Sequence, residues 1–134
     1  MTITATIKNS LLQNDTTVAT EGNRKGIAIP SKHNGQGSSV NGGELLFLSL
    51  ATCFCNDIYR EAVRRSINIK SIEVTVTGEF GMEGEPASNI SYKADIQSDT
   101  PKNEIIELIN HVDTVAEIHN TLRKGVKVSL QIEE

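Results

Sequence analysis

The stretch from Glu44 to Ile67 constrains the fold most, because it contains neither glycine nor proline. An uninterrupted run of this length predicts one long helix. Its first half, ELLFLSLATCFC, is apolar on every side, whereas its second half gains charged residues such as Asp57, Arg60 and Glu61. A helix that is apolar all round is buried all round. We therefore expect its first half to lie at the centre of the fold or of a dimer.

The segments on either side of this helix alternate apolar and polar residues, which is typical of half-buried strands. We predict strands over residues 2–9, 16–21, 26–30, 69–80, 89–97 and 126–134, with a slip in the alternation near Ser71. Turns are predicted over residues 11–15, 22–26 and 81–88, and a long glycine-rich loop over 31–43. Such a loop in a compact domain is either functional or mobile.

A second, amphipathic helix is predicted over residues 98–118, with apolar residues three and four positions apart. Ser98 or Asp99 is the candidate cap, and Pro101 stands near the first helical position. The predicted order is β-β-β-α-β-β-α-β, an α+β fold in a single domain over residues 1–134.

Composition narrows the functional class. Of the 134 residues, 37% are hydrophobic and 4% are aromatic, and tryptophan is absent. This small proportion of apolar residues indicates that further apolar surface is buried in an oligomer. The chain has 13 basic and 17 acidic residues and a net charge of −4, so we expect no positively charged surface that would bind nucleic acid. No apolar run reaches the ~18 residues of a membrane span, so we expect no membrane partner. The first residues do not have the pattern of a signal peptide, so we expect none. Two cysteines are too few for a disulfide scaffold, which favours the reducing cytoplasm as the compartment.

Both cysteines lie within the long predicted helix, at Cys53 and Cys55. Helical residues two apart point about 200° away from each other, so a disulfide between them would require the helix to unwind. The C-x-C spacing also differs from the C-x-x-C redox motif. Two readings stay open: a reactive thiol, or two buried small residues that belong to the core.

Helical spacing separates the two thiols. Cys53 shares its side of the helix with charged residues, namely Asp57, Arg60 and Arg64, whereas Cys55 shares its side with residues of core type, namely Leu48, Tyr59 and Ala62. Cys53 is therefore the better candidate for a working thiol. Asp57, one turn away, would oppose ionisation of this thiol unless Arg60 or a partner residue compensates.

Neither a metal nor a cofactor is expected. The histidines at 33, 111 and 119 are scattered, and with one usable thiol they do not suggest a zinc site. His119 opens a polar stretch, HNTLRKG, at a predicted helix end. The glycine-rich segment HNGQGSSVNGG lacks the spacing of a phosphate-binding loop, so we expect its glycines to serve turns.

Two stretches carry a resemblance to a known family. The first, GGELLFLSLATCFCNDIYREAVRRSINIKSIEVTVTGEF, contains the motif ELL at residues 44–46 followed by Cys53; the second is VAEIHNTLRKGVKVSL, at residues 115–130. In this order they resemble the OsmC/Ohr family (osmotically inducible protein C and organic hydroperoxide resistance) over about residues 40–134. The resemblance implies an OsmC-like fold in which two chains intertwine as a homodimer and bury their central helices.

The resemblance also implies a thiol chemistry. In the family one cysteine attacks an organic hydroperoxide and becomes a sulfenic acid, and a second cysteine resolves it as a disulfide. The reactive cysteine corresponds to Cys53, but the resolving position holds Ala116. The family glutamate that holds the thiolate corresponds to Gly43, with Glu44 one place away. The family arginine has no clear counterpart, since Arg24 lies in a later turn.

Our leading hypothesis is an OsmC-like homodimer with a one-cysteine centre at Cys53, related to thiol-dependent reduction of organic hydroperoxides. Such an enzyme would need an external thiol as reductant. Glu44 and Arg60 are secondary candidates for the site, and Cys55 is a candidate second thiol. The alternative is a non-catalytic OsmC-like dimer that binds a small apolar ligand or has a structural role.

Overall fold

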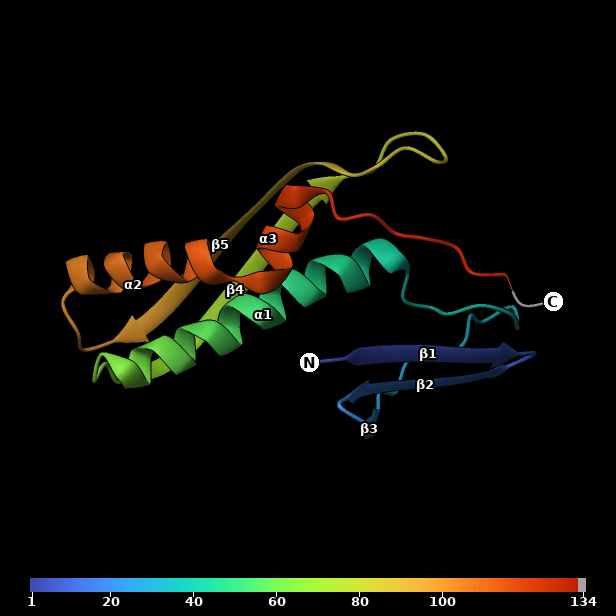
Figure 1. Ribbon diagram of the computed structural model, residues 1–134, viewed down its shortest axis with the longest axis horizontal. Helices are drawn as coiled ribbons and strands as arrows, with labels where there is room; N and C mark the ends of the chain where they lie inside the picture. The colour runs from blue at the N-terminus through green and yellow to red at the C-terminus, as the bar shows by residue number, and fades with distance from the viewer. Residues whose placement is uncertain (133–134) are drawn as a thin grey trace. The chain divides into compact units, whose positions relative to one another are not determined.

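The structure is a computed structural model that describes residues 1–132. The elements in chain order are β1 (Ile3–Ser10), β2 (Gln13–Thr20), β3 (Asn23–Gly26), α1 (Gly42–Arg64), β4 (Ile69–Glu79), β5 (Ser88–Ser98), α2 (Lys102–Val115) and α3 (Glu117–Lys124) (Figure 1). Contacts divide the chain into two compact units, Met1–Leu45 and Leu46–Glu134, so that α1 begins in the first and continues into the second. The predicted α+β class is confirmed.

The first unit is an antiparallel sheet in the order β1-β2-β3. The turn between β2 and β3 consists of Glu21 and Gly22 only, both with positive φ (49° and 80°), as a tight hairpin turn requires. Thr20 therefore pairs directly with Asn23. The prediction of a turn over 22–26 and a strand over 26–30 was wrong, because this tight turn starts the third strand at Asn23.

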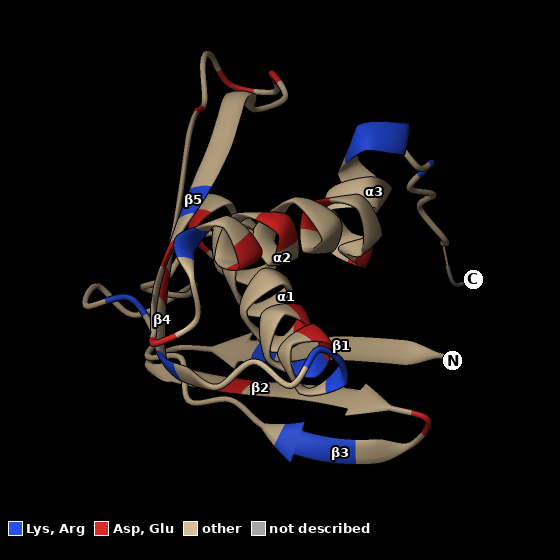
Figure 2. Cartoon of the chain, turned by 90° about the vertical axis from the view of Figure 1, so that its left-hand side faces the viewer, with Lys and Arg blue, Asp and Glu red and all other residues tan. Residues whose placement is uncertain are grey.

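The edge strand β3 carries Arg24 and Lys25, which colour it blue in Figure 2. Charges on an edge strand discourage further strand pairing. The segment after β3 is anchored to the β1–β2 hairpin: the Asn14 amide donates to the carbonyl of Ile29 at 2.9 Å, and the Gly37 N–H donates to the Asn9 side chain at 2.9 Å. The predicted long loop is thus tied down by hydrogen bonds.

Capping interactions at both ends define α1. The Asn41 side chain accepts a hydrogen bond from the Glu44 N–H at 2.8 Å, and the Glu44 carboxylate accepts one from the Asn41 N–H at 2.9 Å. This reciprocal pair is a capping box. At the other end Ser66 adopts φ 55°, and the Ile67 N–H donates to the Ala62 carbonyl at 2.9 Å, as in a Schellman motif. The predicted long helix is confirmed.

The core of the second unit lies between two helices and one hairpin. The second half of α1 and the length of α2 cover the same face of the β4–β5 hairpin (Figures 1 and 2). Phe54, Ile58 and Ala62 of α1 meet Leu108 and Val112 of α2 in a cluster that is almost fully buried. The hairpin adds partly buried side chains, namely Ile69, Ile72 and Val74 of β4 and Tyr92, Ala94 and Ile96 of β5.

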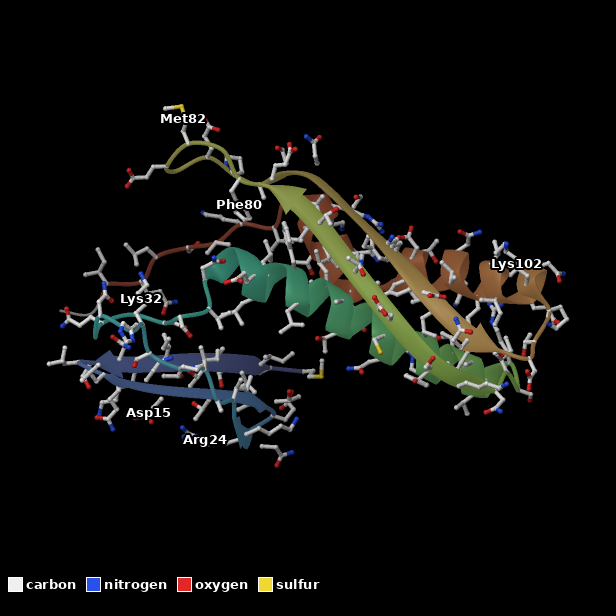
Figure 3. All side chains as sticks on the ribbon, turned by 180° about the vertical axis from the view of Figure 1, so that it is seen from behind. Asp15, Arg24, Lys32, Phe80, Met82 and Lys102 are labelled. Carbon is white, nitrogen blue, oxygen red and sulfur yellow. The ribbon has the colours of Figure 1, made fainter. Side chains whose placement is uncertain are left out.

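The β4–β5 hairpin agrees closely with the strands and the turn that the sequence predicts. Its antiparallel register runs from Ile69 opposite Ser98 to Glu79 opposite Ser88, and a register shift between Ile69 and Ser71 matches the predicted slip. Beyond the strands, the connecting turn holds Phe80 and Met82, which are 54% and 78% exposed (Figure 3).

The predicted second helix is divided in the structure. It breaks at Ala116, a fully buried residue in an extended conformation (φ −65°, ψ 112°) that ends α2 and begins α3. The N-cap of α2 is Pro101, not Ser98 or Asp99. Both candidates are engaged elsewhere, because the Ser98 hydroxyl donates to the Asn68 carbonyl at 2.6 Å and Asp99 pairs with Lys70 at 2.9 Å.

The predicted closing strand is absent from residues 126–132, and residues 133–134 lie outside the described residues. No strand among the described residues pairs with this segment, and its alternating apolar side chains are exposed: Val126 57%, Val128 95%, Leu130 87% and Ile132 81%. Part of the first half of α1 is also exposed within the chain itself: Leu45 and Leu48 are 38% and 59% exposed, whereas Leu50 is only 3% exposed. Intertwined burial and the single domain stay predictions.

Truncating the fully buried Phe54 tests this core. We expect Phe54→Ala to lower the free energy of unfolding by about 3–5 kcal/mol, because it removes a large apolar side chain and leaves a cavity. Val63→Ala, on the same helix but 79% exposed, should change it by less than about 0.5 kcal/mol. Urea unfolding followed by circular dichroism measures both, and equal effects would contradict the assignment of the core.

Candidate functional site

The structure places Cys53 beside a buried carboxylate. Both cysteines are free and half-buried on α1. The Cys53 thiol donates a weak hydrogen bond to Asp57 Oδ2, with 3.9 Å between the sulfur and the oxygen. Asp57 itself is only 6% exposed. The predicted proximity of this thiol to Asp57, one helical turn away, is present in the fold.

Arg60 balances the charge of that carboxylate. Its Nη1 lies 2.8 Å from Asp57 Oδ1, and its Nε lies 3.4 Å from Glu61 Oε1. Glu61, also 6% exposed, is held in turn by Arg64 at 2.7 Å. Buried carboxylates are tolerated when they are paired in this way. The thiol therefore stands at the end of a charge-balanced row along one side of α1.

The other sequence candidates have different surroundings. Glu44 is occupied in the capping box with Asn41 at the start of α1. Ala116, which the sequence resemblance predicts to stand in place of the family's second cysteine, is fully buried at the break between α2 and α3. Cys55 was expected to face the core, but of the residues expected on its side only Ala62 is buried, while Leu48 and Tyr59 are 59% and 43% exposed.

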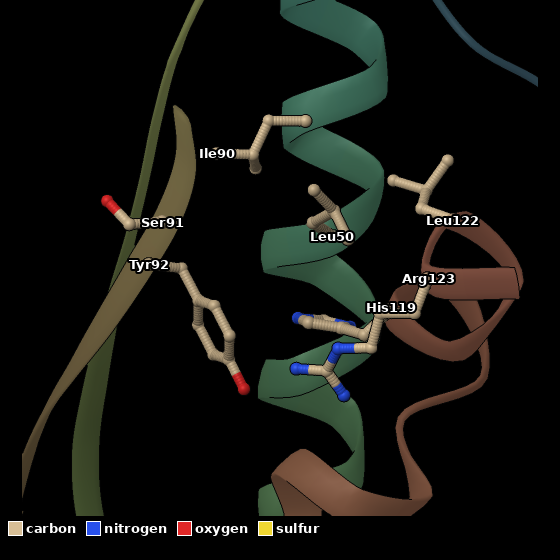
Figure 4. A pocket seen from close by; sticks show the side chains of 7 residues that line it. All are labelled: Leu50, Ile90, Ser91, Tyr92, His119, Leu122 and Arg123. Carbon is tan, nitrogen blue, oxygen red and sulfur yellow. The ribbon is translucent and has the colours of Figure 1, made fainter. Parts of the chain in front are cut away.

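A cavity of about 450 Å³ lies within the second unit, between α1, β5 and α3 (Figure 4). Its lining comprises Leu50 of α1, then Ile90, Ser91 and Tyr92 of β5, and finally His119, Leu122 and Arg123 of α3. From this set, sequence reasoning noted His119 and the stretch HNTLRKG that it opens, which also contains Leu122 and Arg123. The inward alternation of β5 would have indicated Tyr92, but nothing in the sequence shows that α3 turns back against it.

His119 is the most unusual residue of this lining. It is 4% exposed, and neither ring nitrogen has a hydrogen-bond partner within residues 1–132. Two aromatic rings enclose it: the centroid of Tyr92 lies 4.6 Å from that of the imidazole, and the centroid of Phe54 lies 5.9 Å away. Burial of the ring lowers the pKa of His119, because a charged imidazole would lose its hydration there.

Next to His119, three charged or polar groups form a closed set. The Tyr92 hydroxyl donates to Asp113 Oδ1, and Arg123 Nη2 donates to the same oxygen at 2.7 Å. Burial, followed by the hydrogen bond to Asp113, raises the pKa of Tyr92, whereas the Tyr92 hydroxyl lowers the pKa of Asp113. The hydrogen bond to Asp113 raises the pKa of Arg123. This set ties β5, α2 and α3 together with little net charge.

The remaining histidines stand apart from this set. His33 is exposed in the loop before α1, and His111 Nε2 lies 3.8 Å from Glu61 Oε2. Within residues 1–132 no three side chains of the metal-binding types gather. In the same range, no helix has the length and apolar character needed to cross a membrane.

The sequence model of the OsmC-like protein family matches residues 35–131. None of the curated proteins compared with the chain is significantly similar to it in sequence. The family match covers α1 with Cys53, the β4–β5 hairpin and both later helices.

Solved structures share the fold. An OsmC-like protein from Mycoplasma pneumoniae is 23% identical, with a TM-score of 0.63 over 90% of this chain and 87% of that chain. An organic hydroperoxide resistance protein from Legionella pneumophila is 18% identical, with a TM-score of 0.61 over 92% and 90%. The organic hydroperoxide resistance protein OhrB of Bacillus subtilis is 19% identical, with a TM-score of 0.56 over 99% and 98%. At such identities the likeness establishes the fold alone.

Protonation of His119 should weaken the fold. Its pKa is lowered in the folded state, whereas an unfolded histidine titrates near pH 6.5, so the unfolded chain binds the proton better. The stability contribution of His119 is complete above about pH 6.5 and is lost as the pH falls towards the folded-state pKa. The groups that set its field are Arg123, Asp113 and Asp57.

We expect His119→Leu to reduce the loss of unfolding free energy between pH 7 and pH 5 by up to about 2 kcal/mol, because it removes one titrating group. Urea unfolding at both pH values measures this difference. His33→Gln, at an exposed loop residue, is the matched control and should behave like the unaltered chain. An identical pH dependence in His119→Leu would show that the ring is hydrated or charged in the folded state.

Proposed function

The chain belongs to the OsmC-like protein family, and from that premise we propose that it acts in oxidative stress defence as a one-cysteine hydroperoxide reductase centred on Cys53. The family match and the shared fold with organic hydroperoxide resistance proteins support the general role. The observation that carries the assignment to Cys53 is its contact with Asp57, whose charge Arg60 balances.

The proposed reaction begins with loss of the thiol proton, for which the Asp57 carboxylate is the nearest acceptor. The thiolate sulfur attacks the terminal peroxide oxygen, the O–O bond breaks, and the leaving alkoxide takes up a proton to become an alcohol. Cys53 is oxidised to the sulfenic acid, and the hydroperoxide is reduced by two electrons.

Regeneration must use a thiol from outside the chain, because Ala116 has no sulfur. The external thiol displaces water from the sulfenic acid and forms a mixed disulfide with Cys53. A second thiol then releases Cys53 by thiol–disulfide exchange. This cycle fits a reducing compartment such as the cytoplasm. Cys55 takes no part in it, because its side chain leaves α1 in a different direction.

The competing function is a non-catalytic OsmC-like protein that binds a small ligand or has a structural role. Two observations favour it: Glu44 is engaged in a helix cap, and the residue at the resolving position is a buried alanine. The two functions differ in the accessibility of Cys53 in the native protein, which chemical modification measures directly.

We expect Cys53→Ser to reduce consumption of cumene hydroperoxide in the presence of dithiothreitol to the uncatalysed rate, because the attacking sulfur is gone. The matched control, Cys55→Ser, should retain the activity. Iodoacetamide should label Cys53 in the native protein, and a sulfenic acid probe should react after peroxide treatment. A Cys53 that is labelled only after denaturation would exclude the reductase and leave the binding or structural role.

We also propose that the protein is a homodimer. The apolar side chains of residues 126–132 alternate along an extended segment that no described strand covers. Exposed alternating apolar residues of this kind favour pairing with another strand. A second copy of the chain is the occupant that fits, since it presents the same unpaired sheet edges and the same exposed apolar start of α1.

Introducing a charge on the apolar side of this segment tests the dimer. Leu130→Asp should weaken dimerisation by at least about tenfold, because the charge would be buried against the second copy. Ser129→Asp places the same charge on the opposite side of the alternation and should have little effect. Sedimentation velocity over a range of concentrations measures both variants. A monomeric unaltered chain at every concentration would refute this assembly.

A further inference from the structure

The short helix α3 has little buried surface of its own. Of its eight residues only His119 is buried. The extended residue Ala116 separates α3 from α2, and Gly125 ends α3 in the left-handed conformation (φ 61°, ψ 50°). Figure 1 shows α3 turned away from the axis of α2. A helix this short is not stable in isolation, so its position depends on the side chains that join it to its neighbours.

Polar side chains of α3 hold it to the end of α2. Arg123 Nη2 donates to Asp113 Oδ1 at 2.7 Å, and Arg123 Nη1 donates to the Asp113 carbonyl at 2.9 Å. The Asn120 amide donates to the Thr114 carbonyl at 3.0 Å, so that both residues cap the last turn of α2. The side chains of Arg123 and Asp113 are 49% and 40% exposed. Ion pairs with such access to water contribute little to stability, and these contacts fix the position of α3 without holding it strongly.

His119 is the buried contact of α3, and it carries an energetic cost. Its ring packs against Tyr92 and Phe54, but both ring nitrogens are closed off from water and have no hydrogen-bond partner within residues 1–132. A buried polar group without a partner loses the hydrogen bonds that water would supply. If α3 moves outward, water reaches both nitrogens and this cost is removed.

The position of α3 also determines access to the cavity of the second unit. Three of the residues that line this cavity come from α3, namely His119, Leu122 and Arg123, and they stand opposite Leu50 of α1 and Tyr92 of β5 (Figure 4). Leu50 is only 3% exposed. Outward movement of α3 would remove this wall of the cavity and expose Leu50 to solvent.

Protonation of His119 favours the outward position. The groups that face the imidazole are Tyr92 of β5, Asp113 of α2, Asp57 of α1 and Arg123 of α3 itself. Burial, followed by the charge of Arg123, lowers the pKa of His119, and the two carboxylates oppose this more weakly. An imidazole in water titrates near pH 6.5, so the open position binds the proton better than the closed one. Opening therefore becomes easier as the pH falls below about 6.5.

Asp113 does not respond to acid in the same range. The hydrogen bond from the Tyr92 hydroxyl lowers the pKa of Asp113, so its carboxylate keeps its charge and its contact with Arg123. His119 is therefore the group through which mild acid acts on α3.

We propose that α3 is a lid on the cavity of the second unit, which opens as one body at Ala116 and is released by protonation of His119. Ala116 allows this movement because it interrupts the helix, so that α2 and the core cluster stay packed while α3 moves. The lid does not depend on the proposed chemistry at Cys53, and it would operate in a protein whose thiol is inert.

Native-state hydrogen exchange, followed by NMR on the full-length protein at several low urea concentrations, tests whether α3 opens by itself. We expect the amides of residues 120–124 to be at least about tenfold less protected than those of α2, because α3 opens without the core. Their protection should hardly change with urea, since a local opening exposes little surface. Equal protection and equal urea dependence in α3 and α2 would show that α3 opens only when the protein unfolds, and would overturn the lid.

Arg123→Met tests the contacts that hold the lid. It keeps an unbranched side chain but removes the guanidinium, so the protection of α3 should fall at least about fivefold. Lys124→Met is the matched control, because it removes a charge from the next residue of α3, which has no ion pair within residues 1–132. It should leave the protection of α3 unchanged. Equal protection in the two variants would overturn the proposed closed position.

The same measurement at pH 7 and pH 5 tests the release by acid. After division by the intrinsic exchange rates, the protection of α3 should fall at least about fivefold in the unaltered chain, because the open lid binds a proton. His119→Leu should abolish this fall, whereas His111→Gln, at a 40% exposed histidine of α2, should retain it. The same fall in His119→Leu as in the unaltered chain would overturn release through His119.

Discussion

The packing of Phe54 against the β4–β5 hairpin is the contact on which both the core and the cavity depend. Its ring is fully buried, contacts Tyr92 edge-on with 4.9 Å between centroids, and lies 5.9 Å from the ring of His119. The same side chain therefore closes the apolar cluster of α1 and α2 and supports one wall of the His119 environment. Because protein interiors are densely packed, a substitution of Phe54 should alter the packing of both the apolar cluster and the surroundings of His119.

The buried polar side chains beside this core differ in whether they have partners. Along α1, Asp57 and Glu61 are buried but paired with Arg60 and Arg64, so their charges are compensated within one helix. His119 is equally buried but has no hydrogen-bond partner among residues 1–132. The paired carboxylates stabilise a defined arrangement beside Cys53, whereas the unpaired imidazole resists protonation and lowers stability at acidic pH. The thiol and the cavity are thus two different environments within the second unit.

Local patterns predicted much of the fold. The absence of glycine and proline predicted α1, alternation predicted β1, β4 and β5, and the slip near Ser71 was visible before the register shift was known. The errors share a cause. The position of the third strand depends on a tight turn, the break at Ala116 depends on burial, and a strand at 126–132 would depend on a strand partner. None of these three factors can be read from the periodicity of apolar residues. The site was predictable only where it lies on one helix, as with Cys53, Asp57 and Arg60.

By itself the sequence determined most of the element types and the side of α1 that carries Cys53 and its charged neighbours. These properties follow from helical and strand periods, which are local. Only the tertiary structure decided that His119, Tyr92 and Arg123 line one cavity, and that Asp113 takes the charge of Arg123. These residues come from α2, α3 and β5, and their meeting depends on the way the helices fold back onto the hairpin, which no local pattern contains.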